Sequence, residues 1–316
     1  MACTLKPEDI KRVKGLGFLN NKGTDSFNGR VITVNGKITA DQSIAIAEAA
    51  KKYGDGTVCY TTRLTVECPG IPYDHIDAFM EAVKACGLVT GGTGSKVRPV
   101  VSCKGTTCQY GLLDSFALSQ KVHDDFYMGY HQVLLPHKFK IAIGGCPNNC
   151  VKPDLNDLGI VGQLVPNYDE DSCNGCKKCQ VEAICPIGAA KMEDGVLKID
   201  RAICNHCGRC VDQCAFDCIE DGTYGYRVYI GGRWGKSVAH GRLVNHIFTS
   251  EEEVISFVEK AILLFREQGK TGERFATTID RLGFENVESQ LLGNEILGRK
   301  QAILDAQLHL VGGATC

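Results

Sequence analysis

The first hundred residues alternate between two patterns of apolar positions. In residues 40–54 and 72–87, apolar side chains recur every three to four positions, which is typical of amphipathic helices. Residues 29–38 have strand character, and residues 57–67 alternate between apolar and polar positions as a half-buried strand does. The order strand, helix, strand, helix predicts a layered unit of α and β structure.

Two helices have ends that can be read from the sequence. Thr39 and Gln42 stand at the spacing of a capping box, and Gly54 follows the end of the same predicted helix. Ser250 precedes a long apolar-periodic stretch that Gly269 ends. Both stretches are therefore predicted as helices with these boundaries.

The middle and the end of the chain continue the mixed pattern. Residues 97–103 and 137–145 read as strands, and each runs into a cysteine-containing loop. A helix is predicted over residues 115–127, a short strand over residues 158–166, and a helix with breaks over residues 277–307.

Residues 166–222 differ in kind from the rest. They are dense in cysteine, glycine, aspartate and asparagine, and they lack long apolar periodic segments. Such a segment needs something other than an apolar core to hold it together, and metal clusters would serve. Strand character resumes in residues 224–235. We therefore expect a small domain inserted into a larger one.

Composition narrows the class of protein. The chain has 316 residues, 44% of them hydrophobic and 23% charged, which suits a globular protein of about two domains. A formal net charge of -2 implies no polyanionic partner, so nucleic acid is not expected. The N-terminus lacks the apolar core of a signal peptide, and no apolar run approaches the ~20 residues of a membrane span. We therefore expect a cytoplasmic protein without a membrane segment.

The chain has 18 cysteines, most of them between residues 146 and 218. A secreted protein held by disulfides is one explanation, but that pattern belongs to small chains without a core. Reduced thiolates that hold metal clusters account better for this number and this grouping.

Eight of the cysteines form two runs. Each run has three cysteines at x2 spacing and a fourth further on, the pattern with which bacterial ferredoxins hold [4Fe–4S] clusters. In that pattern the remote cysteine of one run binds the cluster of the other. A pair of zinc sites is the alternative, and His206, between two ligands, reads as loop filler or as a residue that tunes a potential. The expected ligand sets are Cys173, Cys176, Cys179 and Cys214 for one cluster, and Cys204, Cys207, Cys210 and Cys185 for the other.

A second cysteine set lies outside the insert. Cys103 and Cys108 follow one predicted strand, and Cys146 and Cys150 follow another. Four thiolates on two strand-end loops can hold one more [4Fe–4S] cluster. A structural zinc site or disulfides are the alternatives.

The second set carries a resemblance to a known family. A cysteine pair followed by GGCPNNC resembles the signature of the sirohaem-dependent sulfite and nitrite reductases. The segments TTRLTVE, SKVRPVVSC, LPHKFKIAIGG and GGRWGK are also similar to elements of that family, over residues 28–275. The resemblance implies that Cys150 also bridges the cluster to the iron of sirohaem.

The resemblance implies a fold class and a domain organisation. The class is α+β, one sirohaem/[4Fe–4S] sulfite reductase half with an inserted two-cluster ferredoxin domain. The insert is similar to those of dissimilatory sulfite reductases and of the C subunit of anaerobic sulfite reductase. The expected parts are a ferredoxin-like domain at 1–98, a cluster-binding domain at 99–165 and 223–316, and the insert at 166–222.

The resemblance also assigns basic residues. Arginine offers fixed charge and forked donors to an oxyanion, and lysine offers a point charge and a transferable proton. Solvated surface charge is the alternative for each residue taken alone. By resemblance, the substrate is bound by Arg63, Arg98, Lys138 and Lys140, and the carboxylates of sirohaem are contacted by Lys104, Arg233 and Lys236.

The function that follows is the six-electron reduction of sulfite to sulfide. Electrons would enter at the insert, cross the strand-end cluster and reach sirohaem through Cys150. Nitrite reduction to ammonia is the alternative reaction, and a non-catalytic electron-transfer subunit is the alternative role. No dinucleotide-binding fingerprint follows a predicted strand, so a separate flavoprotein or ferredoxin is expected as the donor.

Only one strand-end cysteine set is found, so the chain corresponds to a single half of the two-copy enzymes. A homodimer or a larger complex would supply the other half, and the four substrate-binding residues would then serve the partner's haem. The remaining cysteines are expected to be small apolar residues or surface thiols: Cys3, Cys59, Cys68, Cys86, Cys218 and Cys316.

Overall fold

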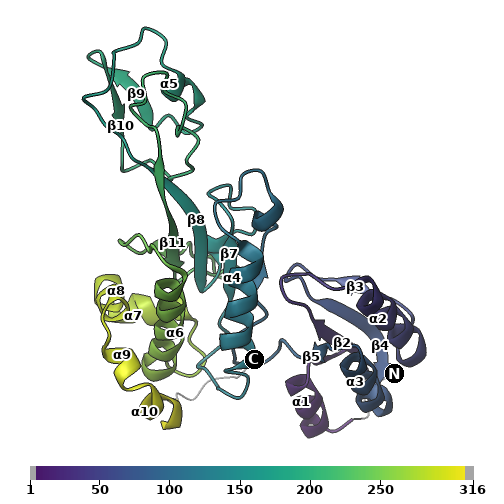
Figure 1. Cartoon of the computed structure of the whole chain (residues 1–316). Coiled ribbons are helices and arrows are strands. Elements are labelled where there is room, and N and C mark those ends of the chain that lie inside the picture. Colours follow the sequence, from purple (N-terminus) through teal and green to yellow (C-terminus); the bar gives the residue numbers. More distant parts are fainter. Residues whose placement is uncertain (1–4, 310–316) are drawn as a thin grey trace.

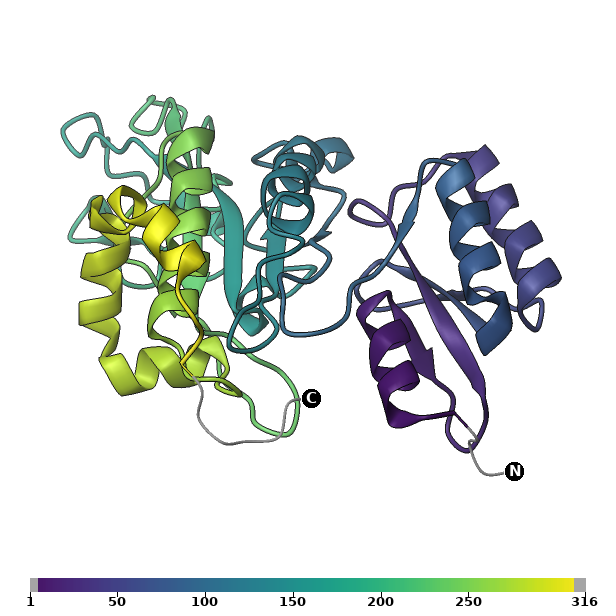
Figure 2. The same cartoon turned by 90° about the horizontal axis from the view of Figure 1, so that it is seen from below.

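The computed structural model describes residues 5–309, so Cys3 and Cys316 lie outside the described residues. Its N-terminal part is an antiparallel sheet in which β2 pairs with β1, β4 and β5, and β4 pairs with β3. Figure 1 shows this part beside the rest of the chain, and Figure 2 shows the two parts from below. The elements are α1 (Pro7–Gly15), β1 (Phe18–Asn20), β2 (Ser26–Ile32), α2 (Ala40–Tyr53), β3 (Cys59–Tyr60), β4 (Val66–Pro72), α3 (Ile76–Ala85) and β5 (Val89–Thr90).

A single apolar cluster holds this part together. Phe27 and Val31 of β2 pack with Ile46 of α2 and with Phe79 and Val83 of α3, and all five are at most 3% exposed. The predicted capping box is confirmed. The Thr39 hydroxyl accepts a hydrogen bond from the Gln42 N–H, and the Gln42 side-chain oxygen accepts one from the Thr39 N–H. The periodicity of residues 40–54 and 72–87 therefore marks the faces that cover the sheet. The second helix is shorter than predicted, because Pro72 ends β4 and a 3-10 turn over Tyr73–His75 precedes α3.

The prediction of one strand over residues 57–67 is wrong. The segment is a hairpin of β3 and the start of β4, closed by a turn in which Leu64 has a φ of 58°. The Leu64 N–H donates to the Thr61 carbonyl at 3.0 Å, and the Thr61 N–H to the Thr65 carbonyl at 2.9 Å. The alternating pattern did not reveal the turn, because apolar and polar residues alternate in both strands of a hairpin. The strand predicted at 29–38 ends at Ile32, before a left-handed turn.

The second sheet has the order β12-β11-β8-β7-β6. Its strands β6, β7 and β8 are parallel, whereas β11 runs antiparallel to β8 and β12 antiparallel to β11. The bounds are β6 (Val101–Ser102), β7 (Ile141–Gly144), β8 (Leu158–Pro166), β11 (Gly222–Ile230) and β12 (Arg242–Leu243). The strand predicted at 158–166 is confirmed.

The strands β6 and β7 are shorter than predicted. Before them, Val97 and Phe139 form only an isolated bridge. Pro99 has no N–H with which to form a hydrogen bond between strands. The N–H of Lys140 donates to the Asp157 carboxylate at 2.9 Å and not to the carbonyl of a neighbouring strand. The backbone ahead of the two strands is thus irregular, and basic side chains emerge there.

Helices α4 (Ser115–Val122) and α6 (Glu251–Gln268) share one apolar cluster with this sheet, and α7 to α10 lie beside α6 (Figures 1 and 2). Ser250 caps α6 by accepting from the Glu253 N–H, as predicted. The helix predicted at 115–127 changes at His123 into a π-helical turn over His123–Met128. The predicted broken helix at the C-terminal end is α7 (Phe275–Leu282), α8 (Phe284–Leu292), α9 (Glu295–Gly298) and α10 (Lys300–Asp305).

The cysteine-rich segment enters and leaves through two paired strands. All nine residues of β8 pair with all nine of β11, from Leu158 with Ile230 to Pro166 with Gly222. The segment between them therefore starts and ends at adjacent points, and in Figure 1 it stands at the far end of these strands. It contains α5 (Gln180–Ile184) and the hairpin of β9 (Ala190–Glu193) and β10 (Val196–Ile199), with a small apolar cluster of its own.

Among residues 5–309, none of the helices combines the length and apolarity that crossing a bilayer requires.

Candidate functional site

Two loops bring the strand-end cysteines together. Cys103 and Cys108 lie in the loop after β6, and Cys146 and Cys150 lie in the loop after the neighbouring parallel strand β7. The loops touch through glycine, because a Cβ on Gly145 would lie 2.6 Å from the Cα of Gly105. Glycine on both sides permits the approach.

The four sulfur atoms share one environment. The Gly145 N–H donates to the Cys103 Sγ at 3.1 Å. Burial raises the pKa of the Cys146 thiol, and charge on Cys103, Cys150 or Cys108 raises it further, so the four interact electrostatically. Cys150 is exposed, whereas the other three are partly buried. Of the four sulfur atoms, that of Cys150 is therefore the most accessible to a group bound on the outer side of the two loops.

In the insert, Cys185 lies with the second cysteine run, as the ferredoxin pattern predicts. Cys185, Cys204, Cys207 and Cys210 line one small cavity. Burial raises the pKa of Cys210 to about 11, and charge on Cys204, Cys207 or Cys185 acts in the same direction. Cys185 therefore lies beside the second cysteine run; that these four cysteines hold one cluster stays a prediction.

The first run lies with Cys214 on the small apolar cluster of the insert. Cys173, Cys179 and Cys214 pack against that cluster, as do Cys185 and Cys210 of the other set. Burial raises the pKa of Cys218, and charge on Cys214, Cys173 or Cys179 raises it further, so these three lie near one thiol. Cys176 is partly buried in the same loop. The Leu197 N–H donates to the Cys173 Sγ at 3.3 Å. Within residues 5–309, no group of three or more His, Cys, Asp and Glu side chains is arranged to hold a single metal ion.

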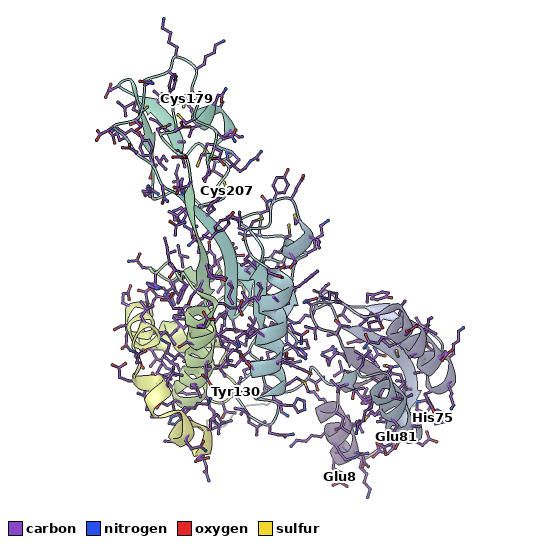
Figure 3. The ribbon with its side chains drawn as sticks, in the orientation of Figure 1. Glu8, His75, Glu81, Tyr130, Cys179 and Cys207 are labelled. Carbon is purple, nitrogen blue, oxygen red and sulfur yellow. The ribbon has the colours of Figure 1, made fainter. Side chains whose placement is uncertain are left out.

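One cysteine run of the insert lies nearer to the strand-end cysteines than the other. Cys207 and Cys146 line the same cleft of about 400 Å³, together with Tyr110 and Asn205. Leu164 of β8 forms a bridge with Cys207. Figure 3 shows Cys207 at the base of the insert and Cys179 near its tip. The second run therefore stands between the first run and the strand-end set.

His206 fastens the base of the insert to β8. It has a φ of 55°, its side chain is 9% exposed, and its Nδ1 lies 3.0 Å from the Gln163 Oε1. Its carbonyl accepts from the Leu164 N–H at 2.8 Å. These contacts fit the prediction that His206 serves the loop's structure.

The four basic residues predicted to bind an oxyanion gather in one place, at the start of the parallel strands. Arg63 reaches there from the β3–β4 hairpin and donates to Asn156 at 3.0 Å and to the carbonyls of Pro99 and Ile141. Lys140 directly precedes β7. His137 and Arg274 lie with these four, and we call the six residues the basic cluster: Arg63, Arg98, Lys138, Lys140, His137 and Arg274.

Burial, assisted by neighbouring positive charge, lowers pKa values in the basic cluster. Burial lowers the pKa of Lys140 to about 8, and the positive charges of Arg63 and Arg274 contribute. Burial lowers the pKa of His137 to about 4, assisted by Lys138 and Arg274. Even the pKa of Arg63 falls to about 10, chiefly through burial. Such an accumulation of partly buried positive charge is relieved by binding an anion.

Besides His137, two residues of this region were not predicted from the sequence, Arg274 and Asp157. Arg274 donates to both carboxylate oxygens of Asp157, at 2.9 and 2.8 Å, and Asp157 is fully buried ahead of β8. Asp157 also accepts from the Lys140 N–H, which fixes the backbone beneath that lysine. No sequence motif marks either residue, because they are 117 positions apart and meet only in the fold.

The basic cluster and the strand-end cysteines occupy opposite ends of the same sheet. Lys140 precedes β7 and Cys146 follows it, so the strand separates them by at least about 13 Å. Arg98 and Cys103 are placed likewise around β6. Because β6 and β7 are parallel, all four cysteines lie at one end and the cluster lies at the other.

The three residues predicted to contact haem carboxylates are also divided between these ends. Lys104 is exposed next to Cys103, at the cysteine end. Arg233 and Lys236 follow β11, whose last residue, Ile230, pairs with Leu158 at the start of β8, so they lie at the basic end. Arg233 is partly buried and donates to Thr277 at 3.0 Å.

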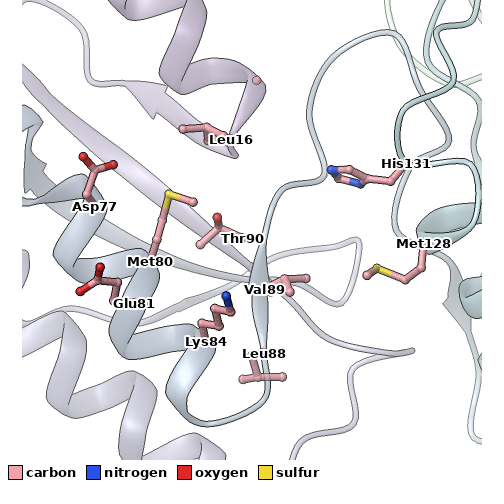
Figure 4. Close-up of a pocket in the computed structure, with 11 residues that line it drawn as sticks. Leu16, Asp77, Met80, Glu81, Lys84, Leu88, Val89, Thr90, Met128 and His131 are labelled. Atoms are coloured by element: carbon pink, nitrogen blue, oxygen red, sulfur yellow. The ribbon is translucent and has the colours of Figure 1, made fainter.

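A further cleft of about 650 Å³ lies between the N-terminal domain and the π-helical turn (Figure 4). Its lining combines apolar residues such as Met80, Val89 and Met128 with charged ones such as Glu81 and Lys84. None of the described residues that line it belongs to the cysteine sets or to the basic cluster, so we assign it no part in the redox site.

Two family models match the chain. The nitrite and sulphite reductase 4Fe-4S domain matches residues 93–300, and the nitrite/sulfite reductase ferredoxin-like half domain matches residues 21–86. The gap between the two matches, residues 87–92, contains β5, the last strand of the first sheet.

Individual relatives agree with these matches. The chain is 32% identical over 242 residues to a coenzyme F420-dependent sulfite reductase of Methanocaldococcus jannaschii, covering 76% of this chain and 38% of the relative. It is 30% identical over 169 residues to the C subunit of the anaerobic sulfite reductase of Salmonella typhimurium, covering 47% of each. The chain therefore spans less than half the length of these relatives. A crystal structure of dissimilatory sulfite reductase I shares the fold, with a TM-score of 0.67, 22% identity and coverage of 85% of this chain and 69% of that one.

Proposed function

Because the chain belongs to the nitrite and sulphite reductase family, we propose that it reduces sulfite to sulfide with sirohaem and three [4Fe–4S] clusters. The observation that carries the proposal is the joint presence of the strand-end cysteine set and the basic cluster in one fold. A thiolate set suits a redox cluster, and a partly buried cationic set suits a small oxyanion.

The cysteine residues present fit iron–sulfur clusters. All twelve are free cysteines, and backbone N–H groups donate to the sulfur atoms of Cys103 and Cys173. In a [4Fe–4S] cube each thiolate binds a different iron, so the four sulfur atoms need not converge on one ion as they would around zinc.

The surroundings of Cys150 fit a larger group on its outer side. Cys150 is exposed, Asn149 before it has a φ of 52°, and Lys104 is exposed on the neighbouring loop. Cys150 would hold sirohaem from the cysteine end, and Lys104 would contact its carboxylates. When bound, sirohaem supplies an iron centre at which sulfite can accept electrons.

Electrons are proposed to enter at the tip of the insert. The cluster of Cys173, Cys176, Cys179 and Cys214 would receive them, and the cluster at the base of the insert would pass them to the strand-end cluster. The cleft that Cys207 and Cys146 share supports this order. The donor is proposed to be a separate flavoprotein or ferredoxin.

The basic cluster is proposed to act on the substrate held by a second copy of the chain. A substrate next to Cys150 lies at the cysteine end of the sheet, whereas Arg63 and Lys140 lie at the other end of the same sheet. A twofold dimer can place the basic end of one copy against the cysteine end of the other. Arg63 and Arg98 would then orient the oxyanion, and Lys140 would donate a proton to a departing oxygen.

Two alternative functions can be compared with sulfite reduction through the residues that they need. The same residues would serve nitrite reduction to ammonia, since nitrite is also a small oxyanion. A non-catalytic electron-transfer subunit would need the cysteines only. The basic cluster, with the Arg63 Nε buried and without a hydrogen-bond partner, favours a catalytic role because electron transfer alone gives it no purpose.

The visible spectrum of anaerobically purified protein tests the proposal. We expect a Soret band and a red band from sirohaem, with about 13 iron atoms per chain from three clusters and one haem. Iron near 12 without these bands would support the electron-transfer role and contradict the enzyme. Turnover with sulfite and nitrite side by side would then identify the preferred substrate.

A further inference from the structure

Cys218 is a buried thiol that the proposed electron path does not use. It follows the predicted cluster ligand Cys214 by four residues and is 2% exposed. Val181, Leu197 and Ile219 form the apolar cluster around it. The sequence offered no reason to separate Cys218 from the other spare cysteines.

The side chain of Cys218 points at a ligand. Its Sγ donates a hydrogen bond to the Cys214 Sγ at 3.1 Å. A cysteine bound to a cluster is a thiolate and can only accept, so the S–H group of this pair belongs to Cys218. Among the other spare cysteines of residues 5–309, Cys68 lies in the N-terminal sheet and Cys86 donates to the Val83 carbonyl.

We propose that Cys218 is a positioning residue that raises the reduction potential of the cluster held by Cys173, Cys176, Cys179 and Cys214. The inference rests on the proposed cluster at these cysteines, but not on sirohaem or on sulfite reduction. Reduction adds negative charge to a cluster, and a hydrogen bond to a ligand sulfur stabilises that charge. The S–H group of Cys218 therefore favours the reduced cluster.

The position of this cluster in the insert gives its raised reduction potential a function. The cluster concerned lies at the tip of the insert, away from the cleft shared with the strand-end cysteines. A raised potential there helps the first cluster to accept an electron from an external donor. Cys218 forms its hydrogen bond with a ligand of this cluster alone, so only one of the three reduction potentials should depend on Cys218.

A reductive titration of the full chain, followed by electron paramagnetic resonance, tests the inference. In Cys218→Ala one cluster should shift to a more negative potential while the other clusters keep theirs. Cys218→Ser retains a hydrogen-bond donor of similar size and should recover most of the shift. Cys68→Ala removes a buried cysteine of the N-terminal sheet and should change none of the potentials.

Iron content must be measured on each variant, so that loss of a cluster is not read as a shift. Unchanged potentials in Cys218→Ala, or equal shifts in the alanine and serine variants, would overturn the inference. Failure to find a cluster at the first run would overturn it as well. A shift in protein that lacks sirohaem bands would sustain it while contradicting the proposed enzyme.

Discussion

Replacing Cys150 with serine should abolish sulfite reduction while the clusters of the insert remain. Cys150 is the exposed sulfur of the strand-end set, and the proposal makes it the link between that set and sirohaem. Serine is a poor ligand for iron that prefers thiolate. We expect turnover with an artificial electron donor to fall by more than about 10²-fold.

The control for this variant is Cys59→Ser, which changes an exposed cysteine of β3 that belongs to neither cysteine set. It should retain wild-type turnover, haem spectrum and iron content. Undiminished sulfite reduction by Cys150→Ser would show that this sulfur does not link the two cofactors.

Replacing Lys140 with methionine should lower kcat/KM for sulfite by about 10² to 10³-fold. Methionine keeps much of the side-chain volume but removes the positive charge and the proton. The Lys140 N–H that binds Asp157 belongs to the backbone and is retained. Lys51→Met, an exposed change on α2, is the matched control and should have no effect.

The pH profile separates charge from proton transfer at this residue. The pKa of Lys140 is lowered to about 8, so the protonated form prevails below that pH and is lost above it. If this form is required, wild-type kcat/KM falls as pH rises through about 8. Lys140→Arg stays charged and should not show this fall, although its rate is lower throughout. A wild-type rate that rises above pH 8 would contradict the role of Lys140 as an acid.

The sequence predicted the helices better than the strands, for physical reasons. Helix α2 carries its own boundary signals in Thr39, Gln42 and Gly54, and these depend only on neighbours in the chain. Strands β6 and β7 depend on partners elsewhere, and their length is set by Pro99 and by the contact of Lys140 with Asp157. Those contacts are not visible in a local pattern.

The same distinction holds for the site. The cysteine spacings are local, so they predicted that Cys185 lies beside Cys204, Cys207 and Cys210; that these residues bind a cluster stays a prediction. The contact between Arg274 and Asp157 joins two distant segments, and no local sequence pattern around either residue predicts it. The separation of the basic cluster from the cysteines depends on strand direction, which follows from the topology of the sheet.

The arrangement of one active site across two chains is the central claim, and mixed dimers test it most directly. Chains carrying Cys150→Ser and chains carrying Lys140→Met can be given different affinity tags, coexpressed and purified through both tags. Each mixed dimer then has one site whose cysteines and basic cluster are both intact, because they come from different chains. We predict about half of the wild-type turnover, although both parent variants are nearly inactive. Mixed dimers as inactive as their parents would contradict the shared site.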